Sequence, residues 1–239
     1  MTNKYLSYDE NRAPKVRAMF SRLAWRYDLV NDVMSFGMHR RWKREAVRIA
    51  LGGKRNARML DLCCGSGDLC FLAEEMGAGQ VTGADFTLPM LAVARRRRAA
   101  AARRSHFVEA DALCLPFPDG AFDVITISYG LRNVAEPQAA LSEMRRVLAP
   151  GGRAVVLDFG KPDNPVAAAL YGAYLRVMMP AVGLLFHGDP ETYLYIPASL
   201  ARYPGQRGVE TMMREAGFAN PRYEERLLGT MGINIGVRP

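Results

Sequence analysis

The alternation of short apolar runs with helix-forming stretches between residues 57 and 158 constrains the fold more than any other feature of the sequence. The runs at 57–63 (ARMLDLC) and 122–128 (FDVITIS) have the length and composition of buried strands. Strands separated by helices pair in parallel through right-handed crossovers, which predicts an α/β fold with a doubly wound sheet. The predicted strands are 57–63, 80–85, 106–110, 122–128 and 153–158, and the predicted helices are 68–76, 88–102 and 138–148.

Two segments fall outside this alternation. Residues 14–50 are helical in pattern, whereas residues 161–204 are apolar, aromatic and interrupted by prolines. Both are expected to cover the carboxyl edge of the sheet, where doubly wound folds bind their ligands. Within the second segment, Arg176 and Pro180 interrupt the apolar stretch 165–186 and argue against a membrane span. We expect an amphipathic helix there, then a break and an apolar loop. Residues 222–237 predict two further strands.

The charge and the cysteines narrow the class of protein. A net charge of +8 favours an anionic partner, and the densest basic run is Arg95 to Arg98, interpreted as a solvated helix face. No aromatic residues interleave with these arginines, which argues against a nucleic-acid surface. The four cysteines form no Cys-x-x-Cys pair and the three histidines are widely spaced, so we expect no metal site. The polar N-terminus predicts a cytoplasmic protein with reduced thiols.

The strongest local signal is the segment LDLCCGSGD at 60–68, in which a strand runs into a Gly-x-Gly turn that opens a helix. Gly65 and Gly67 allow the backbone to approach a ligand closely, and the helix start offers free N–H groups. A dinucleotide fingerprint would need a third small residue, where this chain has Cys70. Asp61, before the turn, would repel a pyrophosphate but suits the ammonium of S-adenosylmethionine. The loop therefore favours a methyl donor.

Polar residues also end the neighbouring strands. Asp85 follows the loop by about 20 residues, the interval at which a carboxylate reaches ribose hydroxyls, and Phe86 comes next. Asp111 and Ala112 follow the third strand, where an acidic side chain can accept from an adenine amino group, and Ser128 ends the fourth. Any one of these alone could be an ordinary strand-end residue, but together at one edge they predict a cofactor site.

Three further residues are candidates for contact with the substrate. Arg132 and Asn133 follow the fourth strand. The alternative interpretation is that Arg132 is an ordinary surface arginine and that Asn133 starts a helix. His187 lies in the proposed lid, where placement and catalysis are equally open.

Longer segments resemble a known family. MFSRLAWRYDLVNDVMSFGMHRRWKR, DLCCGSGDL, EADALCLPFPDGAFDVITISYGLRNV, EMRRVLAPGGRAVVLDFGKP and YLYIPASLARYPGQRGVETMMREAGF are similar to the C-methyltransferases of menaquinone and ubiquinone biosynthesis. The resemblance runs from near Met19 to the C-terminus. The glycine loop is generic to methyltransferases, whereas the Tyr27-Asp28, Gly-Leu-Arg-Asn-Val and Tyr-x-Tyr-x-Pro-x-Ser segments are specific to the quinone group. DLCCGSGDL and GTMGINIGVR resemble the cyanobacterial and plastid branch, which methylates a prenylated naphthoquinone.

The resemblance implies a class I methyltransferase fold, Rossmann-like, with seven mostly parallel strands. Its parts would be N-terminal helices at 14–50, a cofactor-binding core at 57–160, a helical substrate lid at 161–204, and a C-terminal helix and strands at 205–239. It implies that the cofactor, S-adenosyl-L-methionine, contacts Asp85, Asp111, Ala112 and Ser128. It places Tyr27, Arg132 and Asn133 near the quinol. Many relatives have Thr at the position of Cys70, which puts that side-chain contact in question.

The implied reaction moves a methyl group from a sulfonium to a ring carbon. Because the ring carbons of a quinone are electrophilic, the substrate must be the reduced quinol, and the site must align the two reactants and stabilise a quinolate. Arg132 suits the second task, and the candidate bases are Asp158, ranked first for its strand end, His187 and Asp28.

The alternatives are a polyprenyl benzoquinol, another small molecule, or a non-catalytic role for the basic face. Because a prenylated quinol resides in the bilayer, we expect peripheral contact with the inner face of an anionic membrane. The lid would line an apolar tunnel, and the arginine-rich helix would dock on anionic lipid. The sequence leaves open whether the chain forms a homodimer.

Overall fold

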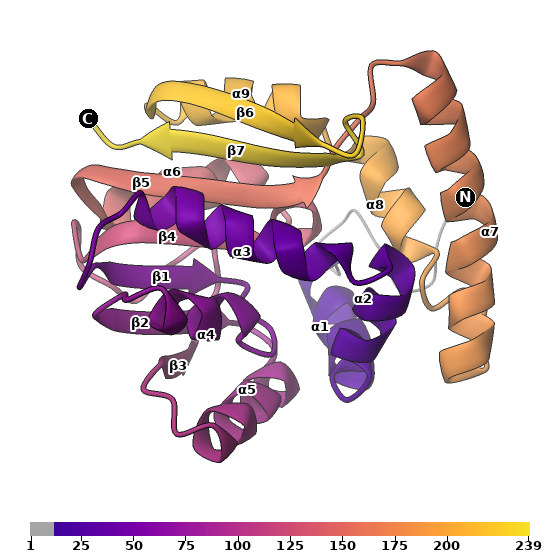
Figure 1. Ribbon diagram of the computed structural model, residues 1–239, viewed down its shortest axis with the longest axis horizontal. Helices are drawn as coiled ribbons and strands as arrows, with labels where there is room; N and C mark the ends of the chain where they lie inside the picture. Colours follow the sequence, from indigo (N-terminus) through magenta and orange to yellow (C-terminus); the bar gives the residue numbers. More distant parts are fainter. Residues whose placement is uncertain (1–11) are drawn as a thin grey trace.

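The computed structural model describes residues 12–239, which form an α/β fold around one mixed sheet (Figure 1). Within these residues the sheet has seven strands in the order β3-β2-β1-β4-β5-β7-β6. This confirms the expected class I methyltransferase fold. The strands are β1 (Arg58–Leu62), β2 (Gln80–Asp85), β3 (His106–Glu109), β4 (Phe122–Ser128), β5 (Leu148–Phe159), β6 (Ala219–Arg226) and β7 (Met231–Val237).

Strand pairing follows the crossovers that the sequence predicts. The first five strands are parallel to their neighbours, while β7 runs antiparallel between β5 and β6. The strand order reverses on either side of β1 and β4, which leaves a crevice at their carboxyl ends. This crevice is where the candidate site lies.

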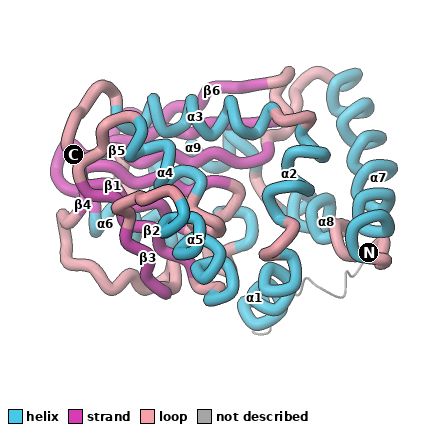
Figure 2. The backbone as a smooth tube through the Cα atoms, turned by 60° about the horizontal axis from the view of Figure 1, so that its bottom comes forward, coloured by secondary structure: helices cyan, strands magenta, loops and turns pink. Residues whose placement is uncertain are grey.

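Alternate residues of each strand enter opposite cores. Met59, Val124 and Val155 pack under the helices of one face, whereas Leu60 and Ile125, one position along, pack on the other. The first face is covered by α3 (Met38–Leu51), α4 (Asp68–Glu75) and α5 (Leu88–Ala100), and the second by α6 (Pro137–Val147) and α9 (Gly205–Glu215), as Figures 1 and 2 show.

The remaining helices form a separate layer beyond the carboxyl ends of the parallel strands (Figure 1). A third apolar cluster joins them, with Val16, Met179 and Ile196 among its buried members. The segment 161–204 and the first part of the segment 14–50 therefore cover the expected edge, whereas residues 38–50, in α3, lie on one face of the sheet. These helices are α1 (Arg12–Leu23), α2 (Tyr27–Ser35), α7 (Pro165–His187) and α8 (Tyr195–Arg202), with a short 3₁₀ turn, η1 (Leu131–Asn133), below them.

The structure corrects the prediction for 165–186. Helix α7 runs without a break through Pro180, because a proline removes only one backbone donor and Val182 and Gly183 beyond it are buried against the layer. Of the described helices, α7 alone is long and apolar enough to cross a membrane by length and composition, and only 22% of its most apolar window is buried.

Two smaller predictions are also corrected. Strand β5 begins at Leu148, so Pro150-Gly151-Gly152 lies inside it, with Gly151 at a φ of 71°. The arginine run is not simply solvated. Arg95 donates to the carbonyl of Phe107 at 3.1 Å, and Arg98 donates to that of Ser105 at 3.4 Å. These bonds tie α5 to the segment around β3.

Candidate active site

The glycine loop between β1 and α4 has backbone angles and close neighbours that disfavour any residue with a side chain at its two glycines. Gly65 and Gly67 have φ values of 53° and 88°, which L-residues rarely adopt. A Cβ on Gly65 would come 3.0 Å from the Met90 side chain, and one on Gly67 would come 3.0 Å from the Phe107 ring. The loop therefore requires glycine at both positions; Gly65 lines the cavity beside Asp85, whereas Gly67 is buried.

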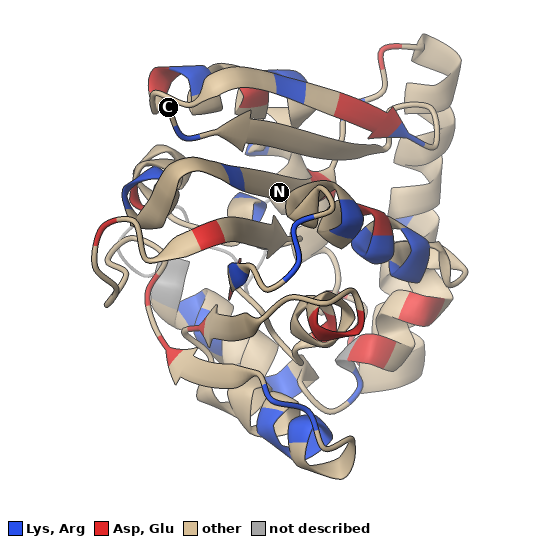
Figure 3. Ribbon diagram, turned by 60° about the vertical axis from the view of Figure 1, so that its left-hand side comes forward, with Lys and Arg blue, Asp and Glu red and all other residues tan. Residues whose placement is uncertain are grey.

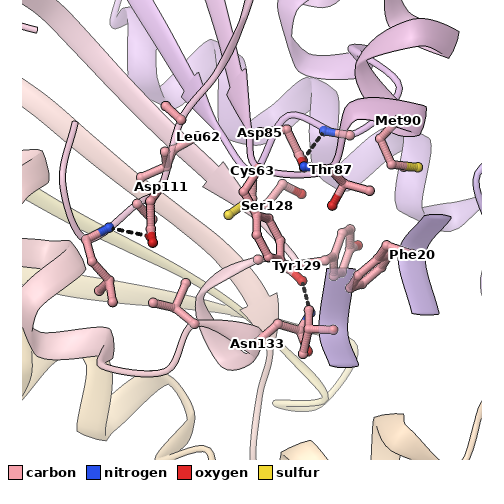
Figure 4. A pocket seen from close by; sticks show the side chains of 18 of the residues that line it. Phe20, Leu62, Cys63, Asp85, Thr87, Met90, Asp111, Ser128, Tyr129 and Asn133 are labelled. Atoms are coloured by element: carbon pink, nitrogen blue, oxygen red, sulfur yellow. Dashed lines mark hydrogen bonds between the residues drawn. The ribbon is translucent and has the colours of Figure 1, made fainter. Parts of the chain in front are cut away.

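Asp85 ends β2 and locks this loop in place. Its carboxylate accepts the N–H of Gly65 at 2.9 Å and the N–H of Thr87 at 2.8 Å (Figure 4). Burial raises the pKa of Asp85, and the backbone hydrogen bonds oppose that shift. Each carboxylate oxygen keeps a further lone pair, so this residue can still accept from ribose hydroxyls.

A cavity opens beside Asp85 at the ends of four strands (Figure 4). The Asp111 carboxylate accepts the N–H of Leu113 at 2.9 Å, which fixes its orientation at the rim. The Ser128 hydroxyl is buried in the wall and has no hydrogen-bond partner among the described residues. A buried hydroxyl of this kind fits a site built for a polar ligand. Of the predicted cofactor contacts, the lining includes Gly65, Asp85, Phe86, Asp111, Ala112 and Ser128.

The other three predicted contacts, Gly67, Asp61 and Cys70, do not line this cavity. Asp61 is buried beneath the loop, where it accepts from the Thr126 hydroxyl at 2.6 Å and from the Cys70 thiol at 3.8 Å. Burial raises the pKa of Asp61 to about 7, against the effect of the Thr126 hydrogen bond. Asp61 and Cys70 thus support the loop from below.

Asp28, named above as a possible base, binds the outer side of the same loop. It accepts from the Ser66 hydroxyl at 2.8 Å and from Arg97 at 3.0 Å. Arg97 also pairs with Asp68 at 2.8 Å, and Lys43 pairs with Asp68 at 2.7 Å. Burial alone would raise the pKa of Asp68, but these two cations lower it to about 2. This network joins α2, α3 and α5 to the start of α4.

A second, apolar cavity lies on the other side of Tyr129, which lines both cavities. Tyr129 follows β4 with a φ of 57°, and Cys63 follows β1 with a φ of 54°. Positive φ at two non-glycine residues costs energy and is typical of functional sites. The apolar cavity is enclosed by α2, α3, α7, α8 and the β6–β7 turn, with Trp42, Phe159, Tyr171, Tyr174, Met179 and Tyr195 in its wall.

Arg132 brings charge into this apolar wall. Its Nε atom lies 3.3 Å from Oδ1 of Asp158, and the two side chains are 3% and 2% exposed. Asp158 also accepts the backbone N–H of Phe159 at 2.9 Å. Burial raises the pKa of Asp158 to about 6, although the charge of Arg132 lowers it. Arg132 lines the apolar cavity, whereas Asp158 lies behind it and lines neither cavity.

The Tyr-x-Tyr-x-Pro-x-Ser segment at 193–199 packs around the Arg132 guanidinium. The Ser199 hydroxyl accepts from the guanidinium at 3.0 Å, and the Tyr195 ring centroid lies 5.4 Å from its central carbon. Asn133 accepts from Arg132 at 3.1 Å, donates to the carbonyl of Tyr129 at 3.2 Å and lines the cofactor-side cavity. These contacts fix the guanidinium where the two cavities meet.

His187 and Tyr27 complete the predicted set. His187 ends α7 and hydrogen-bonds to the Tyr193 hydroxyl at 3.2 Å, and it lines neither cavity. Burial lowers its pKa, aided by Arg26. Tyr27 begins α2, but its side chain lies outside the described part of the structure. Among the described residues, no group of three metal-ligating side chains is found, and all four cysteines are free thiols.

Sequence comparisons decide the family. The family model described as "ubiE/COQ5 methyltransferase family" matches residues 7–238. The chain belongs to the ubiE/COQ5 methyltransferase family. It is 47% identical over 222 residues to a demethylmenaquinone methyltransferase of Thermus thermophilus, covering 92% of this chain and all of that protein. It is 41% identical to a ubiquinone/menaquinone biosynthesis C-methyltransferase of Pseudomonas putida, covering 97% and 91% of the two chains.

Solved structures agree on the fold. A methyltransferase from Thermotoga maritima matches with a TM-score of 0.68 at 18% identity, over 93% of this chain and 99% of that one. A second, from Aquifex aeolicus, matches with a TM-score of 0.59 at 18% identity, over 82% and 89%. This member of the ubiE/COQ5 family is thus an S-adenosylmethionine-dependent C-methyltransferase of menaquinone/ubiquinone biosynthesis with the class I fold.

The residues at the strand ends of this ubiE/COQ5 methyltransferase fit that cofactor. A glycine-cradled main chain, a buried carboxylate that ends β2 and a buried unpartnered Ser128 hydroxyl supply close approach, ribose acceptors and a further polar contact. Asp85, Asp111 and Ser128 would hold the nucleoside part.

Sequence reasoning missed several lining residues. Phe20, Thr87 and Met90 close the cofactor-side cavity from α1 and the start of α5 (Figure 4). Tyr129 immediately precedes the Gly-Leu-Arg-Asn-Val segment, yet the sequence does not predict that it lines both cavities. His39 lines the apolar cavity, and burial lowers its pKa to about 4, so the ring is neutral.

Proposed function

We propose that the chain methylates a ring carbon of a prenylated naphthoquinol, of the kind that demethylmenaquinol or its phylloquinone-type equivalent represents. One observation carries this proposal: a cavity that holds the carboxylates of Asp85 and Asp111 at the strand ends and an apolar, aromatic cavity share Tyr129 as a common wall. An apolar ring in the second cavity would face a methyl donor in the first. The resemblance to the cyanobacterial and plastid branch supports the naphthoquinol.

The side chains of the apolar cavity suit a reduced aromatic ring. When bound, S-adenosylmethionine supplies an electrophilic methyl group on a positively charged sulfur. Arg132 is held by Asp158, Ser199 and Asn133, so its guanidinium is already positioned to stabilise a quinolate oxygen without reorganising. Holding the two reactants in a well-aligned geometry can lower the activation barrier by about 7–11 kcal/mol. The ring carbon gains the methyl, the sulfur keeps the electron pair, and the ring carbon loses a proton.

We assign the proton to Asp158, transferred through a water. The carboxylate lies directly behind the guanidinium, and burial brings its pKa to about 6, within reach of neutral solution. His187 hydrogen-bonds to Tyr193, which lines the apolar cavity, and Asp28 binds the glycine loop. Neither is paired with Arg132.

A prenyl chain exceeds the cavity and must leave it, and the cavity mouth is apolar. Four lining residues are also exposed: Phe36 (74%), Leu170 (67%), Leu227 (52%) and Leu228 (77%). They come from α2, α7 and the β6–β7 turn, which lie far apart in sequence. We propose that this rim rests on the bilayer, so that the prenyl chain passes directly into lipid.

The outer face of α7 extends the rim. Val166, Val177, Leu184 and Leu185 are between 61% and 77% exposed and, with Leu170, form a stripe at helical spacing. We call Val166, Leu170, Val177, Leu184 and Leu185 the α7 stripe. An outward-facing apolar stripe is the reverse of a normal surface helix, and insertion of each large side chain contributes about 1.5–3 kcal/mol.

The arginine-rich helix is a weaker candidate for this contact. Figure 3 shows basic residues gathered on α5, at the bottom of the view. Arg95, Arg97 and Arg98 donate to their own chain, and Arg96 lies 5.0 Å from the exposed Trp25 ring. The net charge of +8 still favours anionic lipid. We therefore propose a protein that works at the inner face of a membrane through α7, with a homodimer seam as the alternative use of the stripe.

The deciding experiment is a methyl-transfer assay under reducing conditions with a demethylated prenyl naphthoquinol and the matching benzoquinol. We expect at least about tenfold higher kcat/KM for the naphthoquinol, which corresponds to about 1.4 kcal/mol, and no transfer to the oxidised quinone. A preference for the benzoquinol would assign the chain to ubiquinone biosynthesis instead. Mass spectrometry of the quinone that accumulates without this protein gives an independent answer.

A further inference from the structure

Two tyrosines on α7 line the apolar cavity with contrasting hydrogen bonding. Tyr174 donates its hydroxyl to the carbonyl of Met34, on α2. Tyr171, one turn earlier, has a buried hydroxyl for which the described residues provide no hydrogen-bond partner. Most buried polar groups in folded proteins are paired, so an exception in a cavity wall requires a reason.

Leaving this hydroxyl unpaired is unfavourable for the protein by itself. A buried polar group without a partner loses its hydration and gains nothing in return. Phenylalanine would fill the same space without that penalty. The hydroxyl also lies within the electrostatic influence of Arg132 and Asp158, the charged pair of the cavity. It thus lies near a charged part of the cavity wall, where a polar group of a ligand would be placed.

The hydroxyl is suited to donate a hydrogen bond. Burial raises the pKa of Tyr171 above that of an ordinary phenol, so the hydroxyl stays protonated at neutral pH. A protonated phenol can donate to a ring oxygen in either its neutral or its ionised form. Arg132 offers donors from another element, so a ring with two oxygens can be bound at both.

We propose that Tyr171 is a substrate-recognition residue, whose hydroxyl binds an oxygen of the aromatic diol and so selects hydroxylated rings over hydrocarbons of the same shape. This inference rests on the proposed function for its ligand class. It goes further by assigning the selection to one side chain outside the quinone-specific motifs. A site built to pair with a ligand hydroxyl discriminates strongly against an analogue that lacks it.

The test measures binding rather than turnover. The chain has two tryptophans, and Trp42 lines the apolar cavity whereas Trp25 is 70% exposed. In a Trp25→Phe background, quenching of Trp42 reports occupancy of the cavity. The probes are 1,4-dihydroxynaphthalene, kept reduced, and naphthalene, which has the same ring without the oxygens.

We expect Tyr171→Phe to weaken binding of the diol by about tenfold and to change naphthalene binding by less than twofold. Its thermal midpoint should not fall, because the variant removes an unpaired buried hydroxyl. Tyr174→Phe is the matched control, from the same helix and the same cavity. It should lower the thermal midpoint, since it leaves the Met34 carbonyl without its donor, but it should leave the preference for the diol unchanged.

An unchanged ratio of diol to naphthalene affinity in Tyr171→Phe would overturn the proposal, as would an equal loss for both probes, which would indicate a packing role. Failure of the proposed function looks different. In that case the wild-type chain would not methylate the prenyl naphthoquinol, while the difference between the two probes would persist.

Discussion

Nε of Arg132 lies 3.3 Å from Oδ1 of Asp158, at a place where both side chains are almost fully buried. Arg132 reaches the apolar cavity, and Asp158 reaches it only through Arg132. Removing one partner of a buried ion pair leaves an uncompensated charge, which is far more costly than losing a surface pair. A substitution in this pair is therefore expected to affect both the stability of the fold and the rate of methyl transfer.

Asp158→Asn is expected to lower kcat by at least about 100-fold, the range of general-base contributions. Burial raises the pKa of Asp158 to about 6, so the wild-type carboxylate is protonated below that pH and kcat should fall as pH decreases through about 6. The variant, which has no group to titrate, should lack this acid limb. The measurement is kcat against pH at saturating quinol.

The exposed pair of Arg207 and Asp163 supplies the control, because its side chains are 64% and 54% exposed and line neither cavity. Asp163→Asn should leave kcat and its pH profile unchanged. Normal turnover by Asp158→Asn at saturating quinol would refute the assignment.

Asp85→Asn should weaken S-adenosylmethionine binding by about 10- to 100-fold, in keeping with the loss of one charge-assisted hydrogen bond at about 1.5–3 kcal/mol. Asp85 accepts two backbone N–H groups that shape the cavity, and the amide has one acceptor oxygen for both. Asp123 is a suitable comparison, since its carboxylate binds Arg58 at the opposite edge of the sheet. Calorimetric titration should show wild-type affinity for Asp123→Asn. The same result for Asp85→Asn would remove it from the cofactor site.

Much of the sheet was predictable because its strands are local patterns. Gln80–Asp85 and Phe122–Ser128 coincide with the predicted ranges, since apolar runs bounded by turn residues leave little freedom in register. Helix α7 was not predictable in the same way. Its continuation through Pro180 depends on packing of Val182 against helices distant in sequence, which no local propensity encodes.

The candidate site was predictable where residues follow strands. Asp85, Asp111 and Ser128 line the cofactor-side cavity because parallel strands bring their carboxyl ends to one edge. Asp61 and Cys70 lie in the same motif yet point beneath the loop, because side chains alternate along a strand and around a helix. The apolar cavity could not be predicted, since five separate elements enclose it.

Asp61 should make stability depend on pH. Its folded pKa is about 7, raised by burial, against a usual value of 3.8. A raised pKa in the folded state means that the folded state binds more protons, so the free energy of unfolding is greatest below pH 3.8 from this group and falls as pH rises through 7. The slope is at most about 1.4 kcal/mol per pH unit.

Asp61→Asn resembles the protonated carboxyl and cannot titrate, so the difference between wild type and variant isolates this group. Urea unfolding at pH 5 and pH 8 should show wild type losing free energy of unfolding relative to the variant as the pH increases. Equal changes for both proteins would mean that Asp61 is ionised throughout.

The α7 stripe predicts how the protein binds vesicles. Val177→Glu places a charge at the centre of the stripe, at a side chain that is 72% exposed, and should weaken binding to anionic vesicles by about tenfold, because a carboxylate does not enter the acyl region without cost. Leu88→Glu, at a 50% exposed leucine on α5, makes the same change of charge away from the stripe. Leu88→Glu should bind as wild type does.

Co-sedimentation should also show that wild-type binding to the vesicles persists at 0.5 M salt, where the Debye length is about 4 Å and arginine-driven contact would be screened. If instead Val177→Glu binds normally and salt releases the protein, the arginine-rich helix makes the contact. If wild type ignores vesicles and Val177→Glu splits a dimer in light scattering, the stripe is a subunit seam.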